Sequence, residues 1–128
     1  MTASAQSDKD VLIIAHPSAP YTSVSFDQLK ACFLKKRVIR IGPIHLVPVN
    51  ALMGSELRKA FQHMVLLMDT DEETKYWQDQ KIKGGQEPPV ESSTPLKMIR
   101  GYVKAVGYVF RNQFKEGQAK IVATIPAK

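Results

Sequence analysis

The chain has 128 residues, 44% of them hydrophobic, and a formal net charge of +6. This length predicts one compact domain with its own core and is too short for two domains of ordinary size. No apolar run reaches the roughly 18 residues that a membrane-spanning helix needs, so the sequence offers no candidate for such a helix.

The N-terminal residues carry little sign of structure. We expect residues 1–10 to be a disordered N-terminal remnant and residues 11–128 to form a single domain. Residues 3–5, Ala-Ser-Ala, have the small-x-small pattern of a signal-peptidase site. On these residues alone, a trimmed export signal and a floppy cytosolic N-terminus remain equal alternatives.

The first predicted strand covers residues 11–15, which are continuously apolar, and the turn residues His16 to Pro20 end it. A capping box of Ser25 and Gln28 then predicts the start of a helix. The apolar residues of that helix that fall on one face are Phe26, Leu29 and Phe33.

A second strand is predicted over residues 44–49, where Pro48 favours an edge position or a strand boundary. A loop with Gly54 and Ser55 follows, and then an amphipathic helix. Its apolar face consists of Leu57, Phe61, Met64, Val65 and Met68. Its polar face, which we expect to be exposed, consists of Glu56, Arg58, Lys59, Gln62 and His63.

The second half continues the alternation of helices and strands. Residues 70–73, Thr-Asp-Glu-Glu, predict another capped helix, with Tyr76 and Trp77 on its buried side, and residues 84–89 predict a loop. Ser93 or Thr94 is expected to cap a further helix that begins at Pro95. Strands are predicted over 106–110 and 120–125. This order predicts an α/β fold with a mostly parallel sheet flanked by helices.

Catalytic and metal-binding patterns are missing from the sequence. Cys32, the only cysteine, lies in a helical pattern as a small core residue. His16, His45 and His63 lack the spacing of a metal site, so we expect no metal, no cofactor and no enzymatic activity. The basic cluster at 35–37 has no aromatic residues interleaved, and we therefore expect no nucleic acid partner.

An ordered set of motifs resembles the phosphate ABC-transporter substrate-binding protein family. The set runs through Ser-x-x-Gln-Leu-x-x-x-Phe-Leu-x-Lys (25–36), Val-Pro-Val-Asn (47–50), Gly-Ser-x-x-Arg-x-x-Phe (54–61), Tyr-Trp (76–77), the Gly-Gly…Pro-Pro loop and Gly-Tyr-Val (107–109). The resemblance covers most of the chain. It implies a single lobe of a periplasmic-binding-protein type II fold, export to the periplasm with removal of a signal peptide, and a solute-binding role without catalysis.

The resemblance also implies a place for the ligand. In this family a loop that opens a helix grips phosphate, and that loop corresponds here to residues 50–57. We therefore predict binding of phosphate or a similar small oxyanion at Asn50, Gly54 and Ser55, with Ser18 and Ser23 contributing from the first turn. Helix amides that lack internal partners and a positive helix end suit an anion at such a loop.

The chain departs from the family pattern at this loop. Asn50 or Ala51 stands where the family has its clamping arginine, and Glu56 and Leu57 replace a glycine and a threonine. One alternative is therefore weak oxyanion capture, with a second chain, for example in a homodimer, forming the other wall of the site. The other alternative is a protein-interaction or signalling module that has lost its ligand and docks on a membrane transporter or sensor protein.

Overall fold

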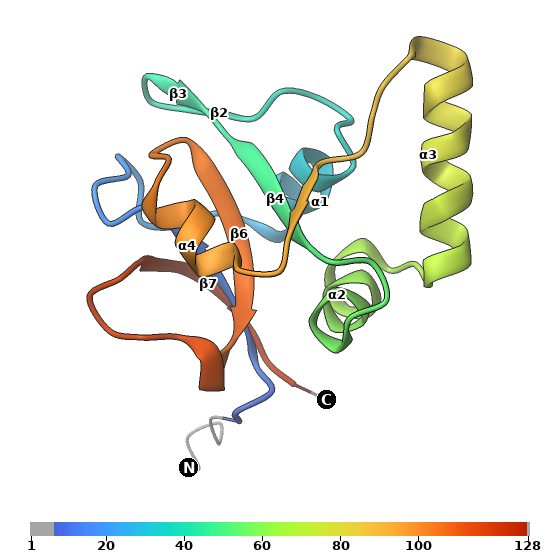
Figure 1. The fold of residues 1–128 in the computed structure, drawn as a ribbon. Helices are drawn as coiled ribbons and strands as arrows, with labels where there is room; N and C mark the ends of the chain where they lie inside the picture. The colour runs from blue at the N-terminus through green and yellow to red at the C-terminus, as the bar shows by residue number, and fades with distance from the viewer. Residues whose placement is uncertain (1–6, 128) are drawn as a thin grey trace.

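The computed structural model describes residues 7–127 and has a five-stranded sheet at its centre (Figure 1). The strands are β1 (Val11–Ala15), β4 (Val47–Ala51), β5 (Val90–Ser92), β6 (Ala105–Phe110) and β7 (Lys120–Ile125), in the order β5-β4-β6-β1-β7. β4 is parallel to β5 and β6, whereas β1 is antiparallel to β6 and β7. Four strands thus run in one direction and only β1 runs against them, which confirms a mostly parallel α/β sheet.

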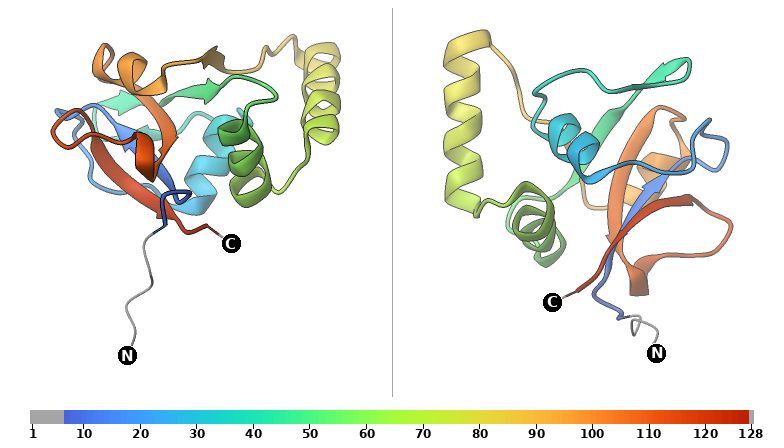
Figure 2. Two further views of the ribbon diagram at one scale, coloured as in Figure 1. Left: turned by 60° about the horizontal axis from the view of Figure 1, so that its bottom comes forward. Right: turned by 180° about the vertical axis from the view of Figure 1, so that it is seen from behind.

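Helices cover the two faces of this sheet unequally. α1 (Phe26–Phe33) and α2 (Glu56–Phe61) lie on one face and the short α4 (Pro95–Arg100) on the other, while the long α3 (Thr70–Gly84) stands beside β4 and β5 (Figures 1 and 2). The remaining elements are short. They are the hairpin β2 (Arg40–Ile41) and β3 (Ile44–His45), the π-helical turn η1 (Gln62–Leu66) that continues α2, and the 3-10 turn η2 (Arg111–Gln113).

The larger core lies on the face that α1 and α2 cover. The ring of Phe61 stacks on that of Tyr108 with 3.9 Å between centroids, and Phe33 packs against both rings. β1 crosses this region with all five residues fully buried, because the sheet is covered on both faces there.

The smaller core lies beneath α4. Ile99 of this helix packs on Val49 and Val109, and a Cβ at Gly107 would come within 3.3 Å of Ile99 Cδ1. A side chain larger than glycine would therefore push α4 away from β6. Because one short helix covers this face, part of it stays open to solvent.

The structure corrects two expectations about strand and helix limits. β4 lies inside the sheet, so the edge position predicted for Pro48 is wrong, whereas the alternative of a strand boundary agrees with its place as the second residue of β4. Pro48 is tolerated because the pairing of β4 with β5 begins one residue later, at Val49. The capping box of α3 lies at Asp69 and Glu72, one residue before the predicted position.

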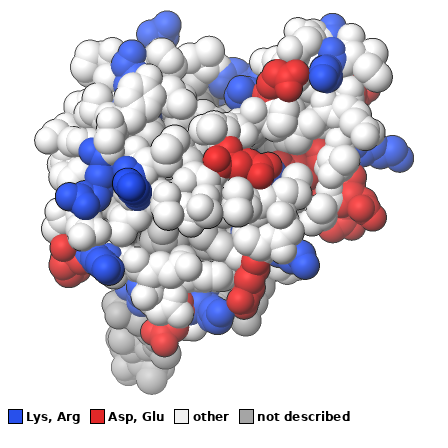
Figure 3. Space-filling view, in the orientation of Figure 1, with Lys and Arg blue, Asp and Glu red and all other residues white. Residues whose placement is uncertain are grey.

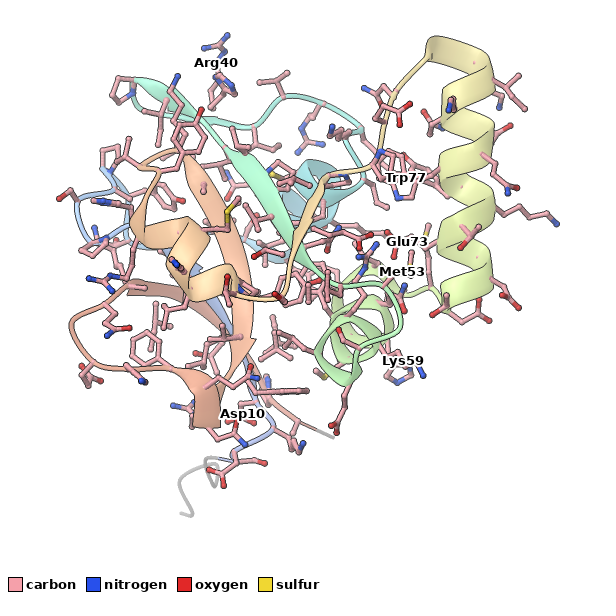
Figure 4. All side chains as sticks on the ribbon, in the orientation of Figure 1. Asp10, Arg40, Met53, Lys59, Glu73 and Trp77 are labelled. Atoms are coloured by element: carbon pink, nitrogen blue, oxygen red, sulfur yellow. The ribbon has the colours of Figure 1, made fainter. Side chains whose placement is uncertain are left out.

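Residues 1–6 of the predicted N-terminal remnant lie outside the described residues. For residues 7–10 the expectation of disorder was wrong, since Asp10 is buried and holds both ends of the domain together. Its carboxylate accepts hydrogen bonds from Ser7 N at 3.1 Å, from Ala127 N at 2.8 Å and from the Arg111 guanidinium at 3.3 Å. Figure 4 labels Asp10 at this end of the molecule.

Candidate functional site

A groove of about 650 Å³ lies on the open part of the sheet, beside α4. We call it the α4 groove. Ser55, after β4, lines one side, and Ser92, Ser93 and Thr94, where β5 ends, line another. Both segments follow the carboxyl ends of parallel strands, the edge at which open α/β sheets bind their ligands.

The α4 groove has an apolar floor and a basic rim. Ala51, Leu57, Leu96 and Val109 supply apolar surface within it. The basic residues of its lining are Lys97, Arg100 and Lys115, all exposed, and its lining includes no aspartate or glutamate. Among residues 7–127 these three cations have no ion-pair partner. In Figure 3, lysine and arginine side chains gather over α4 beside an uncharged area.

Ser55 lies at the groove with its side chain already engaged. Its Oγ accepts a hydrogen bond from Arg58 N at 3.1 Å, which caps α2, and donates one to Leu52 O at 2.7 Å. Gly54 before it has φ +88°, a left-handed conformation that favours glycine, with no atom within 4 Å of a built Cβ. The Ser55 hydroxyl therefore caps α2 and stabilises the turn before it.

Asn50 does not reach the surface. Its side chain is fully buried, and its Oδ1 accepts a 2.7 Å hydrogen bond from the Tyr108 hydroxyl, which in turn accepts one from Ala51 N. The predicted direct contact of Asn50 with a ligand therefore needs correction. In this structure Asn50 supports the end of β4 from within.

Ser18 follows the end of β1 at the opposite edge of the sheet, and Ser23 precedes Val24, whose N donates to Val122 O of β7 at 3.1 Å. Because β1 is antiparallel to β6, Ala15 pairs with Val106, whereas Val11 pairs with Phe110 near the α4 groove. Four residues of extended strand put about 13 Å between these two edges. The structure thus does not bring Ser18 and Ser23 together with Ser55. Both are exposed, and Ser18 N donates to His16 Nδ1.

Arg58 and Gln62 are completely buried, although the sequence pattern predicts an exposed polar face. The Arg58 guanidinium donates to Glu73 Oε2 at 2.8 Å and to Oε1 at 3.3 Å, and its Nη1 donates to Ala51 O at 2.7 Å. Gln62 Nε2 and Trp77 Nε1 also donate to Glu73, at 2.7 and 3.0 Å. Figure 4 shows Glu73 and Trp77 between α3 and the end of β4.

This network keeps the only arginine of the loop region away from a ligand. Burial raises the pKa of Glu73, but the hydrogen bonds from Arg58 and Gln62 outweigh it and leave the pKa below its usual value. Glu73 is therefore ionised and neutralises Arg58. A partly exposed carboxylate, Glu91, adds a second contact to Arg58 at 3.3 Å. The guanidinium holds α2, α3 and β4 together and presents no free fork to an anion.

A second hollow on the other side of the loop is less suited to an anion. Its charged lining has one lysine, Lys59, against three acidic residues, and Gly54 and His63 also line it; the acidic residues are Asp69, Asp71 and Glu72. Three carboxylates would repel a phosphate at neutral pH. Gly54 and Ser55 are thus neighbours in the chain that line different hollows, and only the one at Ser55 is free of acidic residues.

Two further features of the described residues bear on chemistry. Within residues 7–127, His, Cys, Asp and Glu side chains nowhere gather in threes as a metal site would require. In the same range no helix combines the length and the apolar character needed to cross a membrane.

Three solved structures share this arrangement of elements. An ABC-type phosphate transport receptor from Vibrio cholerae superposes with a TM-score of 0.67 and 13% identity, over 90% of this chain and 46% of the receptor. The second is a protein from Clostridium perfringens that is assigned as a phosphate ABC transporter substrate-binding protein and was solved with bound phosphate. It superposes with a TM-score of 0.61 and 17% identity, over 90% of this chain and 45% of that protein. PstS from Borrelia burgdorferi superposes with a TM-score of 0.62 and 13% identity, over 91% of this chain and 51% of PstS.

This chain has the fold of one lobe of these phosphate receptors. The sequence matches no protein-family model, and it matches no curated protein. The chain spans about half the length of each receptor. The predicted single lobe of a periplasmic-binding-protein type II fold is thereby confirmed, and at 13 to 17% identity the likeness concerns the fold.

The α4 groove itself was missed by the sequence analysis. The phosphate-receptor motifs direct attention to Gly54 and Ser55, but Ser92–Thr94 and the cations of α4 lie about 40 residues later. The one available signal was Ser93-Thr94-Pro95, which we interpreted only as a helix start. The strand β5 that precedes it was not predicted, so its place beside Ser55 became visible only in the structure.

Proposed function

We propose that this chain is a non-catalytic lobe that binds phosphate or a similar small oxyanion in the α4 groove. The observation that carries the proposal is the groove at the carboxyl edge of the sheet, lined by three unpaired cations and by no carboxylate. All charged side chains of its lining attract an anion. The fold, shared with a receptor solved with bound phosphate, supports the same ligand class.

The polar contacts would come from the turns at the ends of β4 and β5. Ser55, Ser93 and Thr94 line the groove, and Gly54 allows the chain to turn tightly before Ser55. The Ser55 amide and hydroxyl both donate to Leu52 O, and the Thr94 amide donates to Ser92 Oγ, so Ser93 and the Thr94 hydroxyl are the groups placed to meet the ligand. Lys97, Arg100 and Lys115 would supply the balancing charge. Asn50 acts indirectly, because it fixes the end of β4 through Tyr108.

Binding by this lobe alone should be weak. Ligand sites normally bury 70 to 90% or more of a small ligand, and an open groove offers one wall. We therefore expect a dissociation constant of about 1 mM or weaker for the isolated chain. A second wall from a partner chain, including a second copy, would strengthen binding.

The proposal includes an exported, periplasmic location and work with a membrane transporter or a sensor protein. The resemblance of the sequence motifs to phosphate-transporter binding proteins supports both points. The small-x-small residues at 3–5 are consistent with an export signal, and they lie outside the described residues.

Calorimetric titration with phosphate at constant ionic strength tests the proposal. We expect saturable heat in the wild type, and a rise in the melting temperature that follows the ligand concentration. The double substitution Arg100→Gln and Lys115→Gln should weaken binding at least fivefold, whereas Lys36→Gln, an exposed lysine away from the groove, should leave it unchanged. No heat and no thermal stabilisation at tens of millimolar phosphate would contradict the proposal.

A further inference from the structure

The α4 groove is much larger than an inorganic oxyanion. Its volume of about 650 Å³ falls within the range of roughly 300 to 1,000 Å³ typical of pockets that hold drug-sized organic ligands. A phosphate ion has five heavy atoms, so it would occupy one end of the groove. The rest would remain filled with water against an apolar floor.

The floor consists of apolar side chains, which make no favourable contact with an inorganic anion. Leu57 and Val109 are buried beneath the groove, Leu96 is partly buried, and Leu52 at its mouth is 44% exposed. Removing such apolar surface from water is favourable, by an amount proportional to the area covered. A ligand with an apolar substituent would therefore cover the apolar floor, which remains in contact with water when inorganic phosphate is bound.

The charges define the other half of the ligand. Lys97, Arg100 and Lys115 line the groove without ion-pair partners among residues 7–127, and the lining has no carboxylate. A neutral or cationic apolar molecule would leave these cations uncompensated. The groove thus combines a basic rim with an apolar floor, which fits an amphipathic anion.

Building on the proposed function, we infer that the α4 groove binds an organic phosphorus oxyanion with a short apolar substituent, either a phosphate monoester or a phosphonate, in preference to inorganic phosphate. The oxyanion faces the Ser92–Thr94 turn and the basic side chains, and the substituent covers Leu52, Leu57 and Leu96.

A homologous series of ligands tests the inference. Inorganic, methyl, ethyl, propyl and butyl phosphate are titrated into the full chain by calorimetry, together with butylphosphonate and uncharged butanol. Each methylene group that reaches the floor should tighten binding by up to about fourfold, so butyl phosphate should bind at least tenfold more tightly than inorganic phosphate. Butylphosphonate should follow butyl phosphate, and butanol should not bind.

Two substitutions separate the contributions of floor and rim. Leu52→Ser, at an exposed position, should flatten the dependence of affinity on chain length. Arg100→Gln should weaken the whole series by a similar factor. Arg37→Gln serves as the matched control, because it removes an exposed arginine outside the groove.

The possible outcomes separate the inference from the function on which it rests. Phosphate binding that stays constant or weakens as the chain lengthens would overturn the inference and leave the proposed function standing. If butanol bound as tightly as butyl phosphate, the proposed role of the cations would be overturned. If none of the phosphate ligands binds, the proposed function and the inference both fail.

Discussion

Glu73, in the first turn of α3, accepts two hydrogen bonds from Arg58 of α2, and both side chains are completely buried. Arg58 also donates to Ala51 O at the end of β4. The pair therefore fixes a long helix, a short helix and the strand that leads to the α4 groove. Its removal should affect the stability of the whole domain.

Glu73→Gln should lower the free energy of unfolding by about 3 to 5 kcal/mol, because the buried Arg58 charge loses its main counter-charge. Urea denaturation measures the change. The matched control is Asp71→Asn, an exposed acid in the same helical turn, which should cost about 0.3 to 1 kcal/mol. The double substitution Arg58→Met and Glu73→Leu should recover much of the lost free energy of unfolding. If Glu73→Gln lowered the free energy of unfolding by less than about 1 kcal/mol, the pair would not be needed for stability.

The buried pair should also make the domain sensitive to acid. The pKa of Glu73 in the folded protein lies below its usual value of about 4.3. The contribution of Glu73 to folding stability is therefore complete above about pH 4.3 and is lost as the pH falls through the folded pKa. Unfolding at a series of pH values should show stability declining below about pH 4. The difference between wild type and Glu73→Gln should shrink over the same interval, and a constant difference would contradict this assignment.

Tyr108→Phe should lower stability by about 2 kcal/mol. The Tyr108 hydroxyl donates to Asn50 Oδ1 at 2.7 Å and accepts from Ala51 N at 3.1 Å, and its loss leaves two buried polar groups without a partner. Thermal or urea unfolding measures the effect. Tyr102→Phe, at a tyrosine that is 47% exposed, is the control and should change stability little. Equal effects of the two substitutions would rule out a special role for Tyr108.

The Cys32 thiol should be unreactive in the folded protein. Burial raises its pKa to about 12, and only 4% of the residue is exposed. Thiolate is the reactive form, so a disulfide reagent at pH 8 should modify Cys32 slowly in native protein and rapidly in urea. Fast modification under native conditions would mean that the helix α1 opens readily.

Strand and cap positions could be predicted from the sequence because their signals are local. Continuous apolar residues identify β1, and Ser25 with Gln28 identifies the start of α1, where the capping box is present. The direction of β1 could not be predicted, since an apolar run is the same in either direction. That single reversal moved Ser18 to the far edge.

Long-range pairing explains the other misses. A helical wheel places Arg58 and Gln62 on a polar face, but it cannot show that Glu73, 15 residues after Arg58, covers that face. The π-helical turn at Gln62–Leu66 also changes the phase that the wheel assumes. The α4 groove was missed for a similar reason. Its walls come from separate segments that only the sheet order brings together.

The most direct test of oxyanion binding at the α4 groove is a phosphate titration followed by the amide resonances of isotopically labelled protein. We predict saturable shifts at Ser55, Ser93 and Thr94, and none at Ser18 on the opposite edge of the sheet or at Ser23 beside β7. Shifts confined to that opposite edge, or no saturable shifts at all, would contradict the account.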